Sequence, residues 1–208
     1  MKKQFLNNIK DAKNHSVNEL VINLNDETYE FLENINIESP IEKLHIKGNS
    51  KDNAVLQFNK ITDGVINVIL EDSNINGSID IDKTLIIDEE NMNEEYYEDD
   101  YPKNYMNVTV SMKNIIFNGL TDSKFNCINL YGNVKIDQSK FYGSPLFENS
   151  ILSYNGESRN TIKISNSYFN GVYSNNCISM DNGIFADINS SEFENCSSHL
   201  EPQHLTDG

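Results

Sequence analysis

Residues 134–143 read VKIDQSKFYG, and residues 162–171 read IKISNSYFNG. Both stretches have two apolar residues at alternate positions, a short polar run, a phenylalanine and a glycine. Alternation with a period of two is typical of a β-strand with one buried face. The polar run favours a bend, because short polar side chains hydrogen-bond to turn backbone. One such unit cannot bury its own apolar face, so the sequence predicts that several copies stack.

The pattern occurs five times when the chain is aligned on a bulky apolar anchor residue. The anchors are Ile75, Phe117, Phe141, Phe169 and Phe193, at steps of 42, 24, 28 and 24 residues. A repeat of about two dozen residues that holds short strands is typical of a solenoid. We expect the residue two places after each anchor to take positive φ at a tight corner. These residues are Gly77, Gly119, Gly143, Gly171 and Asn195.

The fold class that fits best is all-β, a right-handed parallel β-helix with a short N-terminal capping helix. Residues 1–15 should form the cap, because Phe5, Leu6, Ile9 and Ala12 fall on one helical face and would cover the open end of the solenoid. The coils should occupy residues 16–198, with an acidic insertion at 88–105. Residues 199–208 are a tail or the start of a further coil.

Two short turns carry a resemblance to a known family. Asp26-Glu27-Thr28-Tyr29 and Ile46-Lys47-Gly48-Asn49 resemble the turns that open the first coils of pectin-lyase-like right-handed β-helix proteins. A Pro-Gly in the family's first turn is Asp-Glu here. The resemblance extends from about Phe5 to Cys196 and implies the fold. It leaves the activity open, because the superfamily includes lyases, hydrolases, phage tailspikes, adhesins and non-enzymatic scaffolds.

Charge and hydropathy narrow the classes of partner and compartment. The formal net charge is −16 and the isoelectric point about 4.5, which argues against nucleic acid and anionic membranes as partners. No apolar run is long enough for a membrane span. Behind Met1 there is no apolar segment typical of a signal peptide. We therefore expect a cytoplasmic protein if Met1 is the natural start, and a secreted or cell-surface one if this is an excised domain.

The three cysteines are expected to be free thiols. Cys127 and Cys177 occupy similar places two coils apart, which corresponds to roughly 9–10 Å. A disulfide needs Cα atoms within about 7 Å. Cys196 lies at the anchor corner, a different position in the repeat. Free thiols fit a reducing compartment or an anaerobe.

The long step of 42 residues holds an acidic, tyrosine-containing segment at 88–102. It is interpreted either as a docking loop for a basic partner or as an unstructured loop in which like charges repel. Calcium would suit its carboxylates, but the spacing matches no calcium motif, so no metal site or cofactor is predicted. The candidate partner-binding residues are Glu94, Glu95, Tyr96, Tyr97, Asp99, Asp100 and Tyr101.

The outward strand positions offer the only candidate catalytic group, Lys135, Asp137, Lys163 and Asp187. The resemblance implies that polysaccharide lyases of the superfamily carry calcium-binding Asp residues and a basic residue on this face. A lysine there could abstract a proton only if burial or a like charge lowered its pKa. The alternative is a row of solvated charges along a sheet. The superfamily's glycosidase motif, paired Asp residues with a Gly-His-Gly, is absent. Its paired-arginine lyase motif is also absent, since Arg159 is the one arginine.

Three hypotheses for function follow from the sequence. The first is a non-catalytic β-helix binding or scaffold module that presents the acidic loop and a polar strand face to a protein or glycan. The second is a polysaccharide lyase or another carbohydrate-active enzyme. The third is a structural spacer of a larger surface protein.

Overall fold

The computed structural model describes residues 11, 14, 17–30, 35–37, 41–57, 61–63, 67–77, 79–81, 107–119, 128–144, 150–157, 159–173, 176–181 and 185–197. These residues form an all-β parallel solenoid, as the repeat predicts. The predicted capping helix, the acidic insertion and residues 199–208 lie outside the described residues or almost entirely so.

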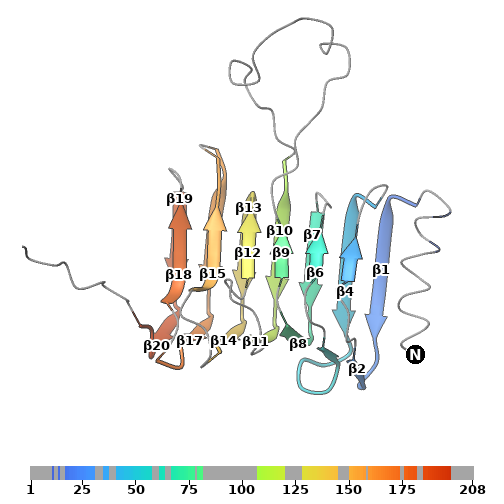
Figure 1. Ribbon diagram of the computed structural model, residues 1–208, viewed down its shortest axis with the longest axis horizontal. Coiled ribbons are helices and arrows are strands. Elements are labelled where there is room, and N and C mark those ends of the chain that lie inside the picture. Colours follow the sequence, from blue (N-terminus) through green and yellow to red (C-terminus); the bar gives the residue numbers. More distant parts are fainter. Residues whose placement is uncertain are drawn as a thin grey trace, which may run out of the picture.

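Three parallel sheets run along the solenoid, and the strands of each lie side by side (Figure 1). Sheet A has the order β1-β4-β7-β10-β13-β16-β19. Its strands are β1 Glu19–Leu24, β4 Lys43–Gly48, β7 Asn67–Glu71, β10 Thr109–Lys113, β13 Asn133–Asp137, β16 Thr161–Ser165 and β19 Phe185–Asn189.

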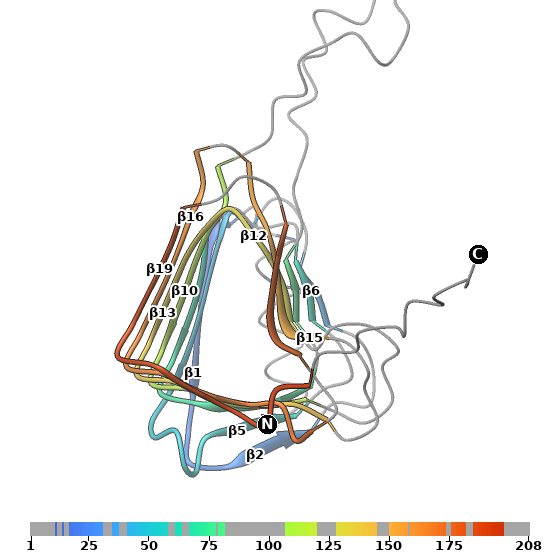
Figure 2. The ribbon, with the colours of Figure 1, turned by 90° about the vertical axis from the view of Figure 1, so that its left-hand side faces the viewer.

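Sheets B and C complete each coil. Sheet B consists of β2 Thr28–Glu30, β5 Val55–Gln57, β8 Asn74–Gly77, β11 Ile116–Gly119, β14 Lys140–Tyr142, β17 Tyr168–Asn170 and β20 Glu192–Glu194. Sheet C consists of β3 Ile35–Ile37, β6 Ile61–Asp63, β9 Ile79–Ile81, β12 Ile128–Tyr131, β15 Ser150–Asn155 and β18 Asn176–Asp181. Viewed along the stack, the three sheets outline a three-sided tube (Figure 2).

The core is one apolar column inside this tube. Val134 pairs with Ile162 and Ile136 with Ile164, and all four side chains are buried. The anchor phenylalanines stack along the column on sheet B. Ring centroids of Phe141 and Phe169 are 4.6 Å apart, and the next pair in the stack is 5.1 Å apart. The alternation therefore places side chains as the sequence predicts.

The positive-φ corner differs from the prediction. Gly119, Gly143 and Gly171 do not take positive φ, whereas Gly77 does, at 156°, and Asn195 does, at 52°. The left-handed column lies instead at the bend between sheets A and B, three residues before each anchor, where φ is 48–53°. In the first four residues of this column the N–H group donates to a carbonyl of the next coil, as from Asn114 to Asp137 at 3.0 Å. The column is Asp72, Asn114, Gln138, Asn166 and Ser190.

A serine column lines the inside of the same bend. The hydroxyl of Ser139 donates to the carbonyl of Asp137 at 2.8 Å and accepts from the N–H of Ile115 at 3.2 Å. Ser167 repeats this arrangement one coil later, and its oxygen accepts from the N–H of Ser139. Each serine therefore connects its own coil to the preceding one. The hydroxyl of Ser73 is buried without a hydrogen-bond partner.

The prediction of three free thiols is wrong, because Cys177 and Cys196 form a disulfide with Cα atoms 5.3 Å apart. Cys177 lies in β18, whereas Cys196 follows β20. Cys196 lies three residues after the anchor Phe193, as Val172 lies three residues after the anchor Phe169 of the preceding coil. At that point the chain turns through two positive-φ residues, Val172 and Tyr173, and the N–H of Tyr173 donates to the carbonyl of Asn195. The two cysteines meet because this corner is short.

Candidate functional site

The structure brings the four candidate catalytic residues together on the outer face of sheet A. Lys135 pairs with Lys163 across β13 and β16, and Lys163 pairs with Asp187 across β16 and β19. Asp137 lies at the end of β13, two residues after Lys135. The predicted grouping is therefore real as a juxtaposition on three consecutive strands.

Asp137 is held by two side-chain hydrogen bonds at the bend. Its Oδ1 accepts from Asn166 Nδ2 at 3.0 Å and from the Ser165 hydroxyl at 2.8 Å. These donors, Asn166 first, stabilise the charged carboxylate and hold the pKa of Asp137 below its ordinary value. A carboxylate held in this way stays ionised and serves the corner of the coil.

The two lysines occupy equivalent positions in neighbouring strands of sheet A. Both Lys135 and Lys163 are exposed to solvent. Neither cavity described below is lined by Lys135, Asp137, Lys163 or Asp187. The arrangement is a flat, charged strand face. It can pair with counter-charges.

The predicted partner-binding residues lie outside the described residues. Glu94, Glu95, Tyr96, Tyr97, Asp99, Asp100 and Tyr101 all fall in the segment between β9 and β10. The topology still places the two ends of that segment. It leaves the solenoid from sheet C and re-enters it in sheet A, so it departs from the corner of the coil opposite sheet B.

A polar and aromatic group lies on the outer face of sheet B. The rings of Tyr142 on β14 and Tyr168 on β17 are half-buried, with centroids 5.8 Å apart and planes inclined by 58°. The Tyr168 hydroxyl donates to Glu194 Oε2 at 2.7 Å and accepts from Asn170 Nδ2 at 2.8 Å. The hydrogen bond to Glu194 raises the pKa of Tyr168, because it stabilises the protonated hydroxyl.

This tyrosine group is further ordered by its neighbours. Asn170 Oδ1 accepts from the N–H of Val172 at 2.9 Å and from Asn195 Nδ2 at 3.2 Å. On the other side of Tyr142, Asn118 Nδ2 donates to Asn76 Oδ1 at 2.7 Å. The polar side chains are thus fixed by one another, and the two rings present a preorganised surface.

The sequence prediction missed this tyrosine group, although a signal for it exists. The outward positions of the second strand lie one residue on either side of each anchor, and the row after the anchors holds only Asn, Tyr and Glu. The predicted candidates Lys135, Asp137, Lys163 and Asp187 all lie at outward positions of the first strand. The row after the anchors is Asn76, Asn118, Tyr142, Asn170 and Glu194.

Sheet C carries a small polar cavity of about 180 Å³. Its polar lining includes Asp80, Asn129 and Ser153, which pair in successive strands β9, β12 and β15. Asn129 Nδ2 lies 3.5 Å from Asp80 Oδ1. The cavity offers amide, hydroxyl and carboxylate groups in a row, but it is too small for more than a small polar ligand.

Two further features can be stated for the described part of the chain. No group of three His, Cys, Asp or Glu side chains there is arranged to hold a metal ion. No helix there is long and apolar enough to cross a membrane.

Comparison with known proteins does not assign the chain to a family. No protein-family model, curated protein sequence or solved structure gives a significant match.

Proposed function

We propose that this chain is a non-catalytic binding module of the pectin-lyase-like β-helix type, which presents the outer face of sheet B to a neutral glycan. The observation that carries the proposal is the Tyr142–Tyr168 pair, held in place by Glu194 and Asn170. A tyrosine offers an apolar ring and a polar hydroxyl. A sugar ring offers the complementary combination, an apolar face with hydroxyl groups around its edge.

The charge of the chain selects among glycans. A net charge of −16 repels an acidic polysaccharide. The polar groups beside the tyrosines are amides, a carboxylate and the exposed Lys140, which pairs with Tyr168. Amides and carboxylates accept hydrogen bonds from neutral sugar hydroxyls, and the ammonium and amide groups donate to them. A neutral glycan is therefore the favoured ligand class. A lyase acting on acidic polysaccharide is disfavoured by the same charge and by the exposure of Lys135 and Lys163.

Affinity gels cast with a panel of neutral polysaccharides test this proposal. Tyr142→Ala should weaken retardation by about tenfold or more, because one lost aromatic contact costs roughly 1.5–3 kcal/mol. Tyr168→Phe should weaken retardation less, because this variant keeps the aromatic ring and loses only the hydrogen bonds of the hydroxyl with Glu194 and Asn170. Lys163→Ala, on sheet A, is the matched control and should bind like the wild type. Retardation that is unchanged in Tyr142→Ala, or absent across the panel, contradicts the proposal.

The acidic segment is proposed as a second contact, for a basic partner protein. Its composition suits such a partner, and its two ends join sheets C and A, away from sheet B. Deleting residues 89–101 should abolish capture of the partner while the circular dichroism spectrum keeps its β-sheet form. Undiminished capture would remove the segment from the proposal. Glycan binding should persist in the deletion variant, which separates the two contacts.

The disulfide indicates the kind of cellular compartment in which the protein works. Disulfides form and persist in oxidising surroundings such as the cell surface, and Cys177–Cys196 replaces the expected free thiols. We infer that the module works in a secreted or cell-surface protein, where it can also act as a spacer. Cysteine labelling of the protein taken from its native host, without reductant, should leave the disulfide pair unlabelled; full labelling would contradict this inference.

A further inference from the structure

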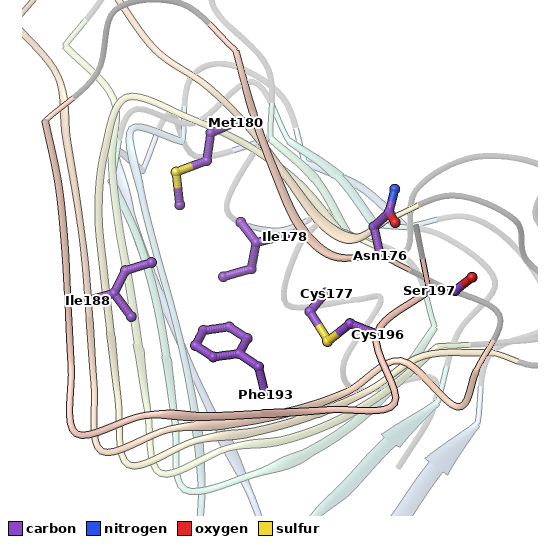
Figure 3. Close-up of a pocket in the computed structure, with 8 residues that line it drawn as sticks. All are labelled: Asn176, Cys177, Ile178, Met180, Ile188, Phe193, Cys196 and Ser197. Carbon is purple, nitrogen blue, oxygen red and sulfur yellow. A yellow bond between two sulfur atoms is a disulfide. The ribbon is translucent and has the colours of Figure 1, made fainter. Parts of the chain in front are cut away.

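The last described coil exposes an apolar hollow at the end of the tube. Ile178 and Met180 from sheet C, Ile188 from sheet A and Phe193 from sheet B all point into it (Figure 3). Its volume is about 560 Å³. Ile188 and Phe193 are 42% and 40% exposed, whereas their counterparts one coil earlier, Ile164 and Phe169, are fully buried. The repeat therefore continues its core pattern into a surface that nothing among the described residues covers.

The same coil presents three strand edges. Within the described residues, β18, β19 and β20 each have one neighbour in their sheet, whereas strands in the middle of each sheet have two. Unpaired N–H and C=O groups along a strand edge are a template for another strand. The three edges face the same direction, so they fit one more complete coil better than a single strand.

The disulfide fixes the conformation of the terminal coil before any partner binds. Cys177 and Cys196 both line the hollow, and their bond ties β18 to the chain just after β20. The terminal coil is thereby held as a closed ring. A surface that is already ordered loses less conformational entropy when it binds.

Charge indicates the chemistry of the occupant. Residues 176–197 contain Asp181, Asp187, Glu192 and Glu194 but no Lys, Arg or His. Some pairs in sheet A place opposite charges side by side, such as Lys43 with Glu19 at 2.6 Å and Lys163 with Asp187, although Lys135 pairs with Lys163. A second copy docking end to end would bring two acidic rims together, which is repulsive.

We propose that this end of the solenoid is a docking site for one further β-coil that carries basic outward residues. The coil would add a strand to each sheet in the existing register. Its apolar residues would cover Ile188 and Phe193, and its cations would face Asp187, Glu192 and Glu194. Glu194 also accepts from the Tyr168 hydroxyl of the glycan face, but the docking site rests on the apolar hollow and the strand edges and does not require glycan binding.

A synthetic coil offers a direct probe. The peptide has the sequence of residues 161–184, which is one repeat step of 24 residues. In register it places its Lys163 opposite Asp187, because Lys163 and Asp187 already pair this way within the chain. Tyr168→Lys and Asn170→Lys in the peptide supply cations opposite Glu192 and Glu194, as the pairing of β17 with β20 implies. Cys177→Ser in the peptide prevents disulfide exchange.

The peptide should bind saturably to the intact chain and protect the amides of β19 and β20 from hydrogen exchange. A peptide with glutamate at the three cationic positions should bind at least about tenfold more weakly, because like charges then face each other. Asp187→Lys in the protein should weaken binding of the basic peptide. A peptide that also carries Lys163→Glu should restore it. Asp187→Lys changes an outward residue and leaves the core intact. Restored binding of the charge-swapped peptide would therefore show that the variant is still folded.

Three outcomes would overturn the proposal. The first is equal binding of the basic and acidic peptides, or binding of neither. The second is self-association of the chain that buries β19, which would make a second copy the occupant. The third is peptide binding that appears only after removal of residues 198–208, which would make that segment the occupant.

Discussion

At the scale of single residues, the serine column is the clearest case in which the same side chain has opposite effects in two coils. Ser139 satisfies the buried N–H of Ile115, whereas the hydroxyl of Ser73 is buried without a partner. Ser139→Ala should lower the free energy of unfolding by about 1–3 kcal/mol, the cost of leaving a buried donor unsatisfied. Ser73→Ala should leave it unchanged or raise it. Urea unfolding midpoints of the two variants measure the difference, and equal losses would contradict the assignment.

Asp137 gives the chain an acid-sensitive corner. Its folded-state pKa lies below the unfolded value because Asn166 and Ser165 donate to the carboxylate. The stabilisation is therefore fully present above the unfolded pKa, about 3.9, and is lost as the pH falls through the folded pKa. Asn166→Ala should flatten the dependence of the thermal midpoint on pH between about 2 and 5. An unchanged slope would show that the hydrogen bonds do not perturb Asp137.

At the scale of strands and corners, the left-handed bend sets which residues suit the repeat. Gln138 takes φ 51° in the middle of this column, a conformation that costs most side chains roughly 1–2 kcal/mol. Gln138→Gly should therefore stabilise the fold by up to about 1 kcal/mol after the entropy of glycine is counted. Lys135→Gly, in the extended strand β13, is the matched control and should destabilise it. Thermal midpoints that fall in both variants would contradict the role of the bend.

The elements were predictable where a regular period marks them. Val134 and Ile136 alternate with Lys135, and burial follows this alternation. The polar run predicted a bend three residues before each anchor, at Asn166 for example, but not that this bend is left-handed, because positive φ was expected at the glycine after the anchor. Glycine is permissive and does not by itself show which φ the chain needs. Sequence period thus located the strands better than the corners.

The candidate site shows the same limit. Lys135 and Lys163 were correctly predicted to be neighbours, because register follows from the repeat. Tyr168 donates to Glu194, 26 residues further along the chain. This hydrogen bond depends on the direction in which each side chain points, and the sequence period does not predict that direction. The disulfide was missed for a related reason, since only equivalent positions such as Cys127 and Cys177 were compared. Contacts between different corners of neighbouring coils need the path of the chain.

At the scale of the whole molecule, each coil contacts only its neighbours, so stability should be local. The disulfide belongs to the last described coil, in which Phe185, Ile188 and Phe193 are exposed. This coil has one stacked neighbour and therefore the least burial to hold it. Its order should depend on the Cys177–Cys196 bond more than that of any inner coil does.

Reduction should therefore loosen one end of the solenoid and leave the rest intact. Closing a loop of this length contributes about 2–4 kcal/mol, so Cys196→Ser should speed hydrogen exchange at β18, β19 and β20 while β4 and β7 keep their protection. Thiol titration of the unfolded, unreduced chain should find one of the three cysteines reactive, and all three after reduction. Three reactive thiols before reduction would exclude the bond. Uniform loss of protection along the solenoid would instead show that the coils unfold as one unit, because independent coils cannot transmit the loss of a terminal bond to β4.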